Sequence, residues 1–219
     1  MKKILFSLIY SGLLVGGLMA QEGWRGALRK MPLSPDTLLN RDNCLPLLLG
    51  AFQSNEVVKA LVFLPAVSDD FYLLSRDRPK LDIKSDNLLD AIIALTNATP
   101  VRATFKAPLL LLHLDRDGLE FKMVISHRLT AKRLDQQCSF PNAVWIDWHW
   151  ERLQPELQAA LRMKVLPDGP SVDAWHFARH NMAAWNLSDW ELLAALSLTG
   201  KTSISVERNR LVFGLREAP

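Results

Sequence analysis

The chain has 219 residues, 49% of them hydrophobic and 22% charged, and a formal net charge of +3. This composition is typical of a globular protein with one medium-sized domain or two small ones, and it excludes a disordered chain. Two of the positive charges, Lys2 and Lys3, lie at the extreme N-terminus, and without them 24 basic residues face 23 acidic ones, so no nucleic-acid partner is indicated.

The first twenty residues have the pattern of a bacterial secretory signal. A basic start is followed by an apolar segment, residues 4–19, and by the small residue Ala20. We expect cleavage after Ala20; cleavage after Gly17 is the alternative, because Leu18 is large for its place before the cut. An uncleaved anchor is the third possibility, although the segment is shorter than the roughly 20 residues that span a bilayer. The sequence therefore predicts a periplasmic or secreted bacterial protein with no membrane span once the signal is removed.

The mature chain is expected to have two modules. Residues 21–43 contain several glycines and prolines and are predicted to be a poorly structured lead-in. The first module is predicted over 44–127 and the second over 144–219, with a linker at 128–143. Apolar runs open the first module, and the run at 57–64 is predicted to be a strand because it is rich in β-branched and aromatic residues.

Cys44 and Cys138 are the two cysteines of the chain. In an oxidising compartment they can form one disulfide, and the alternative is two free thiols. Their wide separation gives no support for a metal site.

A duplicated segment is the most informative internal feature. Residues 85–99 and 188–202 match at seven of fifteen positions without a gap, at an offset of 103. The identical pairs are Ser85/Ser188, Asp86/Asp189, Leu89/Leu192, Ala91/Ala194, Leu95/Leu198, Thr96/Thr199 and Thr99/Thr202.

Both copies have the pattern of an amphipathic helix. In the second copy Ser188 and Glu191 form a capping box and Gly200 is placed to end the helix. The first copy keeps the Ser-Asp start but has Leu88 in place of the glutamate, and Asn97 is its expected stop. The duplication therefore predicts two helices of similar length.

Each predicted helix is followed by two strands, which indicates a helix-plus-hairpin unit. Further strands are expected elsewhere, together with a helix near 155–161. The expected strands are 71–74, 101–105, 109–112, 119–125, 144–150, 163–166, 204–206 and 211–215. We predict an α+β fold of two related small modules, each a helix packed on a small mixed or antiparallel sheet.

The two units, 85–112 and 188–215, share an A-x-x-x-L-T core that begins at Ala91 in one and at Ala194 in the other. This unit resembles the short N-terminal domain of bacterial secretins and TonB-dependent receptors. The resemblance implies a periplasmic docking or signalling module that works through contacts rather than through chemistry.

Most of the tryptophans lie between 145 and 190. On a strand, Ile146, Trp148 and Trp150 would share one face, and Trp145, Asp147 and His149 the other. Such a cluster can form an aromatic platform for a sugar or a partner, or it can fill a core, which is the interpretation we favour. The candidate ligand- or partner-binding residues are Trp145, Trp148, Trp150, Trp175 and Trp185.

His176 and His180 have the i, i+4 spacing that places two imidazoles on one face of a helix. With His149 they could hold a divalent metal, although the glutamate that follows the first histidine in zinc proteases is Phe177 here. Partly exposed or hydrogen-bonded structural histidines are the favoured alternative.

The sequence therefore predicts a non-enzymatic exported protein without a cofactor, which acts by contact with an envelope protein or with itself. Two alternatives stay open. The first is glycan or small-ligand binding by the tryptophan cluster at 145–190. The second is a metal-dependent hydrolase that uses His176 and His180.

Overall fold

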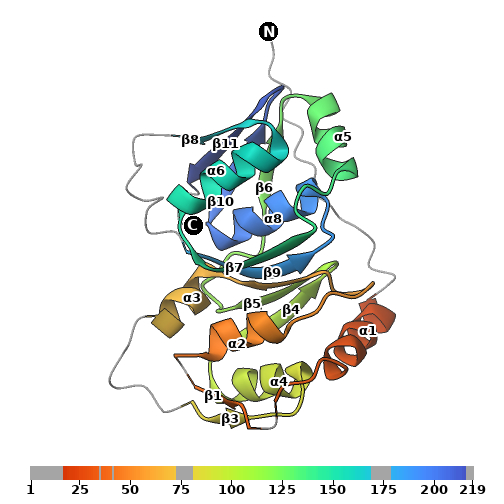
Figure 1. Cartoon of the computed structure of the whole chain (residues 1–219), viewed down its shortest axis with the longest axis vertical. Coiled ribbons are helices and arrows are strands. Elements are labelled where there is room, and N and C mark those ends of the chain that lie inside the picture. Colours follow the sequence, from red (N-terminus) through yellow and green to blue (C-terminus); the bar gives the residue numbers. More distant parts are fainter. Residues whose placement is uncertain (1–16, 35, 41, 73–80, 169–178, 216–219) are drawn as a thin grey trace.

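The computed structural model describes residues 17–34, 36–40, 42–72, 81–168 and 179–215, which form an α+β fold as predicted (Figure 1). The helices in this part of the chain are α1 Gly17–Arg29, α2 Cys44–Ala51, α3 Pro65–Tyr72, α4 Leu88–Ala98, α5 Arg128–Gln136, α6 Trp150–Leu161 and α8 Asp189–Thr199. The strands are β1 Leu38–Leu39, β2 Ala60–Phe63, β3 Ile83–Lys84, β4 Arg102–Lys106, β5 Leu109–His113, β6 Lys122–Ile125, β7 Asn142–Trp148, β8 Lys164–Asp168, β9 His180–Trp185, β10 Thr202–Val206 and β11 Arg210–Leu215.

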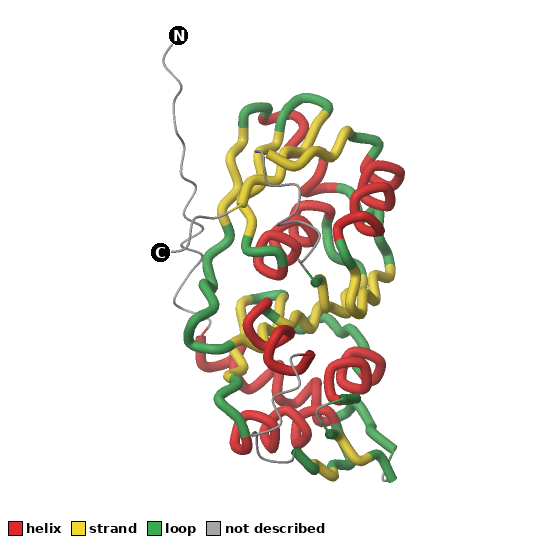
Figure 2. Tube along the Cα trace, turned by 90° about the vertical axis from the view of Figure 1, so that its left-hand side faces the viewer, coloured by secondary structure: helices red, strands yellow, loops and turns green. Residues whose placement is uncertain are grey.

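The strands form three sheets in a layered arrangement (Figures 1 and 2). A five-stranded sheet, in the order β4-β5-β2-β9-β7, crosses the middle of the molecule. Helices α6 and α8 lie between it and a four-stranded sheet, β6-β10-β11-β8, while α1, α2 and α4 cover its opposite face. The short pair β1-β3 lies beyond these helices. None of the helices in the described ranges has the length and apolar character needed to cross a membrane.

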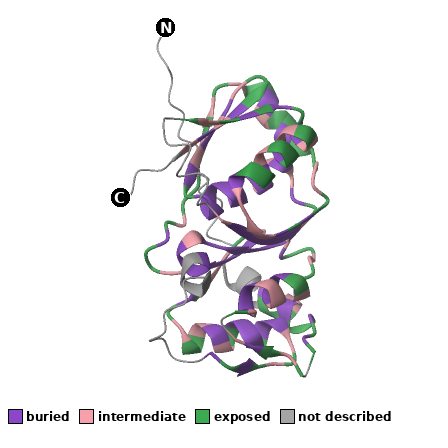
Figure 3. Cartoon of the chain, turned by 60° about the vertical axis from the view of Figure 1, so that its left-hand side comes forward, coloured by how far each residue is buried: buried purple, intermediate pink, exposed green. Residues whose placement is uncertain are grey.

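The inner strands of the five-stranded sheet, β5, β2 and β9, are buried on both faces, and buried residues fill the layers on either side of them (Figure 3). In β2, Ala60 and Val62 join the core that contains α8, whereas Leu61 and Phe63 join the core that contains α2 and α4. A strand that alternates between two apolar layers needs an unbroken apolar sequence, because neither face meets water. This requirement explains the apolar runs at 57–64 and 109–112.

The two copies of the duplicated segment have the same local topology. Strand β5 pairs antiparallel with β4 and parallel with β2, and β11 pairs antiparallel with β10 and parallel with β8. Each copy is therefore a helix and a hairpin whose second strand lies beside an earlier parallel strand. The structural duplication extends upstream of the segment that the sequence comparison detects.

The helix ends differ between the copies. Ser188 and Glu191 form the predicted capping box, and Gly200 follows the last residue of α8 as expected. In the first copy the cap is Asn87, whose side chain accepts a hydrogen bond from the Asp90 backbone N–H. Helix α4 therefore begins at Leu88, later in the duplicated segment than α8 does. Asn97 lies inside α4 rather than at its end. The missing glutamate of the first copy therefore coincides with a later helix start.

The surroundings of the two helices also differ. Helix α8 is enclosed by strands of both large sheets and by α5, so nearly all of its residues are buried. Helix α4 covers only the outer side of its sheet. Accordingly, the exposed Asp90 of α4 aligns with the buried Leu193 of α8, and Ile93, 42% exposed, aligns with the fully buried Leu196.

Strand pairing crosses the predicted linker at 128–143. Strand β9 belongs to the segment predicted as the second module, yet it pairs with β2 and β7 in the five-stranded sheet. Conversely, β6 belongs to the first predicted module and pairs in parallel with β10. Both halves of the chain therefore contribute strands to both large sheets.

Three segments have more helix than the sequence predicted. Residues 21–43, expected to have little structure, contain most of α1 and bury Trp24 and Leu28 in the core. The predicted linker contains α5. The strand expected at 71–74 is wrong where the structure describes it, because α3 extends to Tyr72. Helix α3 starts at Pro65, whose fixed φ suits the first turn of a helix.

The two cysteines lie in different environments and are not paired. Cys44 is the first residue of α2 and is buried beneath the five-stranded sheet, whereas Cys138 is exposed between α5 and β7. The structure thus has the alternative arrangement of two free thiols.

Exchange of the aligned side chains provides a test of the layered fold. Leu193→Asp places an unpaired charge between two sheets and should lower the free energy of unfolding by more than about 4 kcal/mol. The reciprocal Asp90→Leu loses only its contact with Asn87 and should cost less than about 1 kcal/mol. Urea unfolding followed by tryptophan fluorescence measures both. Equal costs would contradict the enclosed position of α8.

Candidate functional site

The tryptophan cluster is interrupted by a β-bulge. The pairing of β7 with β9 shifts register between Trp145 and Trp148, and Asp147 has a left-handed backbone with φ of 56°. The bulge overturns the predicted alternation, because Trp145 and Trp148 both pack in the core that contains α8 and stack with their ring centroids 5.4 Å apart. Ile146 packs in the opposite core.

The candidate tryptophans that the structure describes pack in or against the two cores, and Trp148 and Trp185 are only partly buried. Trp145 and Trp150 are buried, and Trp150 contacts Phe213 of β11. The ring of Trp148 is covered by the guanidinium of Arg152, 4.0 Å from its centroid. Trp185 packs against Phe52 at the other face of the sheet, and Trp175 lies outside the described residues. The described part of the cluster therefore supplies core packing.

His180 is the first residue of β9, not a helical residue, and it is 2% exposed. Its Nδ1 lies 2.7 Å from the hydroxyl of Thr199, while its Nε2 has no hydrogen-bond partner in the described structure. Burial, with a smaller contribution from His149, lowers the pKa of His180 to about 4. The imidazole is therefore neutral at physiological pH.

The predicted metal site is not assembled in the described part of the chain. His149 is the residue before α6, with its Nε2 3.9 Å from Asp147, and His176 lies outside the described residues. Among residues 17–34, 36–40, 42–72, 81–168 and 179–215, no group of three or more His, Cys, Asp or Glu side chains is arranged to hold a metal ion.

A polar network surrounds the bulge instead. The backbone N–H of Asp147 donates to Asn181 Oδ1, and Asn181 Nδ2 donates to the buried hydroxyl of Ser68 in α3. Arg179 donates to the Asp147 carboxylate at 2.9 Å. These bonds connect β7, β9 and α3, so the network stabilises the left-handed backbone of the bulge and ties α3 to the sheet.

A second candidate lies at the opposite edge of the same sheet. A hollow of about 460 Å³ opens between α1, α4 and the start of β4. Its lining is about equally polar and apolar, and it includes two arginines and two threonines. The lining includes Trp24, Arg25, Ile93, Thr96, Pro100 and Arg102.

The hollow adjoins the unpaired edge of β4. In the described sheet β4 pairs only with β5, in an unbroken register from Arg102 to Lys106. Bulges, prolines, charged side chains and short length protect an edge strand against pairing; the other edges of the two large sheets have a bulge, a proline or only four residues, whereas β4 has charges at its two ends, Arg102 and Lys106. Strand β7 has the bulge, β8 contains Pro167, and β6 has four residues. Strand β4 is the most regular of the four edges.

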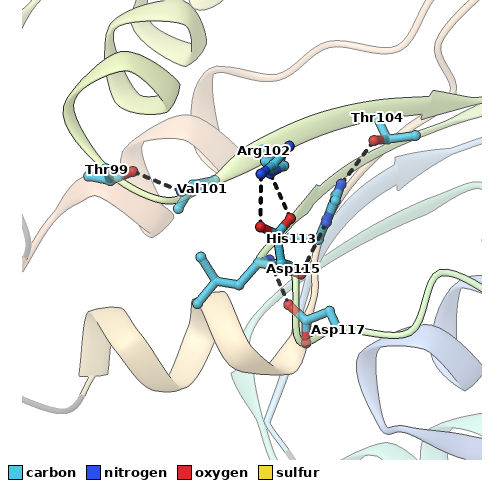
Figure 4. Close-up of polar contacts among 8 residues, drawn as sticks. Thr99, Val101, Arg102, Thr104, His113, Asp115 and Asp117 are labelled. Carbon is cyan, nitrogen blue, oxygen red and sulfur yellow. Dashed lines mark hydrogen bonds and ion pairs between the residues drawn. The ribbon is translucent and has the colours of Figure 1, made fainter.

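The charges beside this edge are held by partners (Figure 4). Arg102 makes a two-pronged contact with Asp115, with Nε 2.7 Å from one carboxylate oxygen and Nη2 2.8 Å from the other. On the neighbouring strand, His113 Nε2 lies 2.9 Å from the Thr104 hydroxyl. Both contacts lie on the face of β4 away from Phe105. Arg102 also lines the hollow, but its guanidinium is paired with Asp115.

Trp24 closes the other side of the hollow. Its ring stacks on Phe105 of β4 with centroids 6.3 Å apart, and the Arg25 guanidinium lies 5.5 Å from the Trp24 centroid. The indole N–H of Trp24 is buried and has no acceptor in the described residues. Trp24 and Arg25 were not predicted as site residues, because they lie in the segment 21–43, expected to have little structure, and they contact β4 only in the folded chain.

Comparison with known proteins gives no relative to guide the assignment. No protein-family model matches the chain, and neither a curated protein nor a solved structure matches it.

The neutral state of His180 predicts a pH dependence of stability. The unfolded chain binds this proton near pH 6.5 and the folded chain only near pH 4, so the unfolded state holds more protons between these values. The free energy of unfolding should therefore fall by about 3 kcal/mol as the pH falls from about 6.5 to 4. Urea unfolding across this range, compared with His180→Gln, measures the effect. Parallel curves for the two proteins would contradict it.

The environments of the two thiols predict unequal reactivity. Burial raises the pKa of Cys44 to about 12, so almost no thiolate is available at neutral pH. The native, unreduced protein should react with Ellman's reagent at one thiol, and Cys138→Ser should abolish that reaction. Unfolding in urea should expose the second thiol. If the unreduced, urea-unfolded protein does not react with Ellman's reagent at either cysteine, a disulfide has formed, and the assignment of two free thiols is wrong.

Proposed function

We propose that this protein is an exported, non-enzymatic binding protein that takes up an extended segment of a partner chain along β4. The hollow beside the regular, unpaired edge of β4 is the observation that carries the proposal. An added strand would receive main-chain hydrogen bonds from the edge, and one of its side chains would enter the hollow. Edge and hollow together supply both affinity and selectivity.

The lining indicates the chemistry of the segment. Trp24, Ile93 and Pro100 offer apolar surface, which suits an aliphatic or aromatic side chain. Arg25 stands at the same hollow, so an acidic side chain next to the apolar one would find a cation there, whereas Arg102 is already paired with Asp115. The proposed ligand is an extended segment with an apolar residue beside an aspartate or glutamate.

The secretory pattern at the N-terminus supports the periplasm or the cell exterior as the place where this binding occurs. The helix-plus-hairpin units support a docking role, since the short N-terminal domains of secretins and TonB-dependent receptors that they resemble work through contacts. The proposed partner is an envelope protein, and a second copy of this chain is the alternative occupant.

Selection of peptides from a random phage-displayed library on the purified protein tests the proposal. Selected peptides should carry the apolar-acidic pattern, and they should slow amide exchange in β4. Ile93→Asp places a carboxylate in the hollow at a half-exposed position and should weaken peptide binding more than ten-fold.

Val144→Asp is the matched control. Val144 is 41% exposed on β7, at the opposite edge of the same sheet, so this variant should bind the peptides as the wild type does. Peptides that bind both variants alike, or that protect β7 rather than β4, would overturn the proposal. A library that yields no peptide above background would also overturn it.

A further inference from the structure

Basic residues gather at the end of the molecule formed by α5, the junction of α6 with β8, and the β10-β11 turn, at the top of Figure 1. We call this surface the basic end and define it as residues 126–137, 161–165 and 206–211. It contains seven basic side chains and two carboxylates, a net charge of +5, whereas the whole chain has +3. The basic residues, all exposed, are Arg128, Lys132, Arg133, Arg162, Lys164, Arg208 and Arg210.

Hydrogen bonds between the three segments hold these charges in one surface. Thr130 Oγ1 of α5 donates to the Arg208 carbonyl at 2.9 Å, and the Lys164 backbone N–H donates to the Asn209 carbonyl at 3.0 Å. Arg133 reaches the carbonyl of Leu161 at the end of α6. Segments that are far apart in sequence therefore combine their charges. The two carboxylates are Asp135 and Glu207, and Glu207 is bonded to Arg210.

A leucine projects from the same surface. Leu129 is 75% exposed in the first turn of α5, and Lys132 and Arg133 follow it at the i+3 and i+4 positions of the same helix face. The opposite face of α5 buries Thr130 and Leu134. Exposure of the Leu129 side chain to water does not stabilise the fold. An apolar side chain within a basic helix face is instead typical of segments that lie at a membrane interface.

We propose that the basic end binds the surface of a bilayer that contains anionic phospholipids, with Leu129 inserted between the headgroups. The basic charge complements the lipid phosphates, and each basic residue near such a surface contributes about five-fold to affinity. The three segments contain no tryptophan, tyrosine or phenylalanine for base stacking, which favours a bilayer over a single-stranded nucleic acid. This inference does not depend on the proposed function of β4.

Sedimentation of the full chain with vesicles tests the proposal. The protein should bind vesicles of equal parts phosphatidylglycerol and phosphatidylcholine at low salt, bind pure phosphatidylcholine weakly, and lose the difference at high salt. Lys132→Glu with Arg133→Glu should weaken binding to the anionic vesicles at least ten-fold.

Two exposed lysines in the other half of the molecule provide the matched control. Lys30→Glu with Lys84→Glu makes the same change in total charge, away from the basic end, and should leave most of the binding intact. The apolar segment 4–19 is common to all variants, so the difference between the two double variants is the readout. Equal loss in both would overturn the proposal.

Leu129→Asn separates a bilayer from other polyanions. This variant should bind the anionic vesicles several-fold more weakly with an unchanged salt dependence, because it removes apolar contact and no charge. If Leu129→Asn has no effect, and a DNA duplex or polyglutamate binds the basic end as tightly as the vesicles do, the surface is a general polyanion site and the proposal fails. Absence of vesicle binding at low salt would also overturn it.

Discussion

β2 and β5 have no exposed residue, so each side chain along them must find an apolar neighbour above or below the five-stranded sheet. On one side α2 and α4 provide those neighbours and meet water with their outer faces. On the other side α8 provides them, but nearly all of the residues of α8 are themselves buried, so α8 has to be covered in turn. The four-stranded sheet supplies that cover. The layered order of the molecule thus follows from burial of the central sheet on both faces.

Patterns among neighbouring residues in the sequence predicted several of the helices and strands correctly. The apolar run before Pro65, the Ser188 capping box and the two hairpins are features of neighbouring residues, and the structure contains all of them. Strand β9 was not predicted because HNMAAW has no β-branched residue, and its position inside a sheet, not its propensity, makes it a strand. Likewise Trp24 and Leu28 make α1 part of the core through contacts that no local pattern reveals.

The candidate sites depend on tertiary structure to the same degree. Sequence spacing indicated tryptophans and histidines as candidate site residues. Of these, His180 is buried in the interior. The stack of Trp145 on Trp148 follows from a bulge that strict alternation along the strand could not predict. The hollow beside β4 joins residues from α1, α4 and β4, and the basic end joins three separate segments. The net charge of the chain without Lys2 and Lys3 is near zero, so it did not predict this second surface; the compensating acidic residues lie elsewhere in the fold.

The place of β9 determines the order in which the chain can complete its fold. Strand β2 receives β5 from the next segments of the chain, but its other edge is filled only by β9, more than a hundred residues later. During synthesis, the first half can assemble its helices and one hairpin while the middle of its sheet stays open. That apolar edge is a hazard for aggregation until the second half arrives. The duplicated halves are thus obliged to fold as a single cooperative unit, in which each half protects the other.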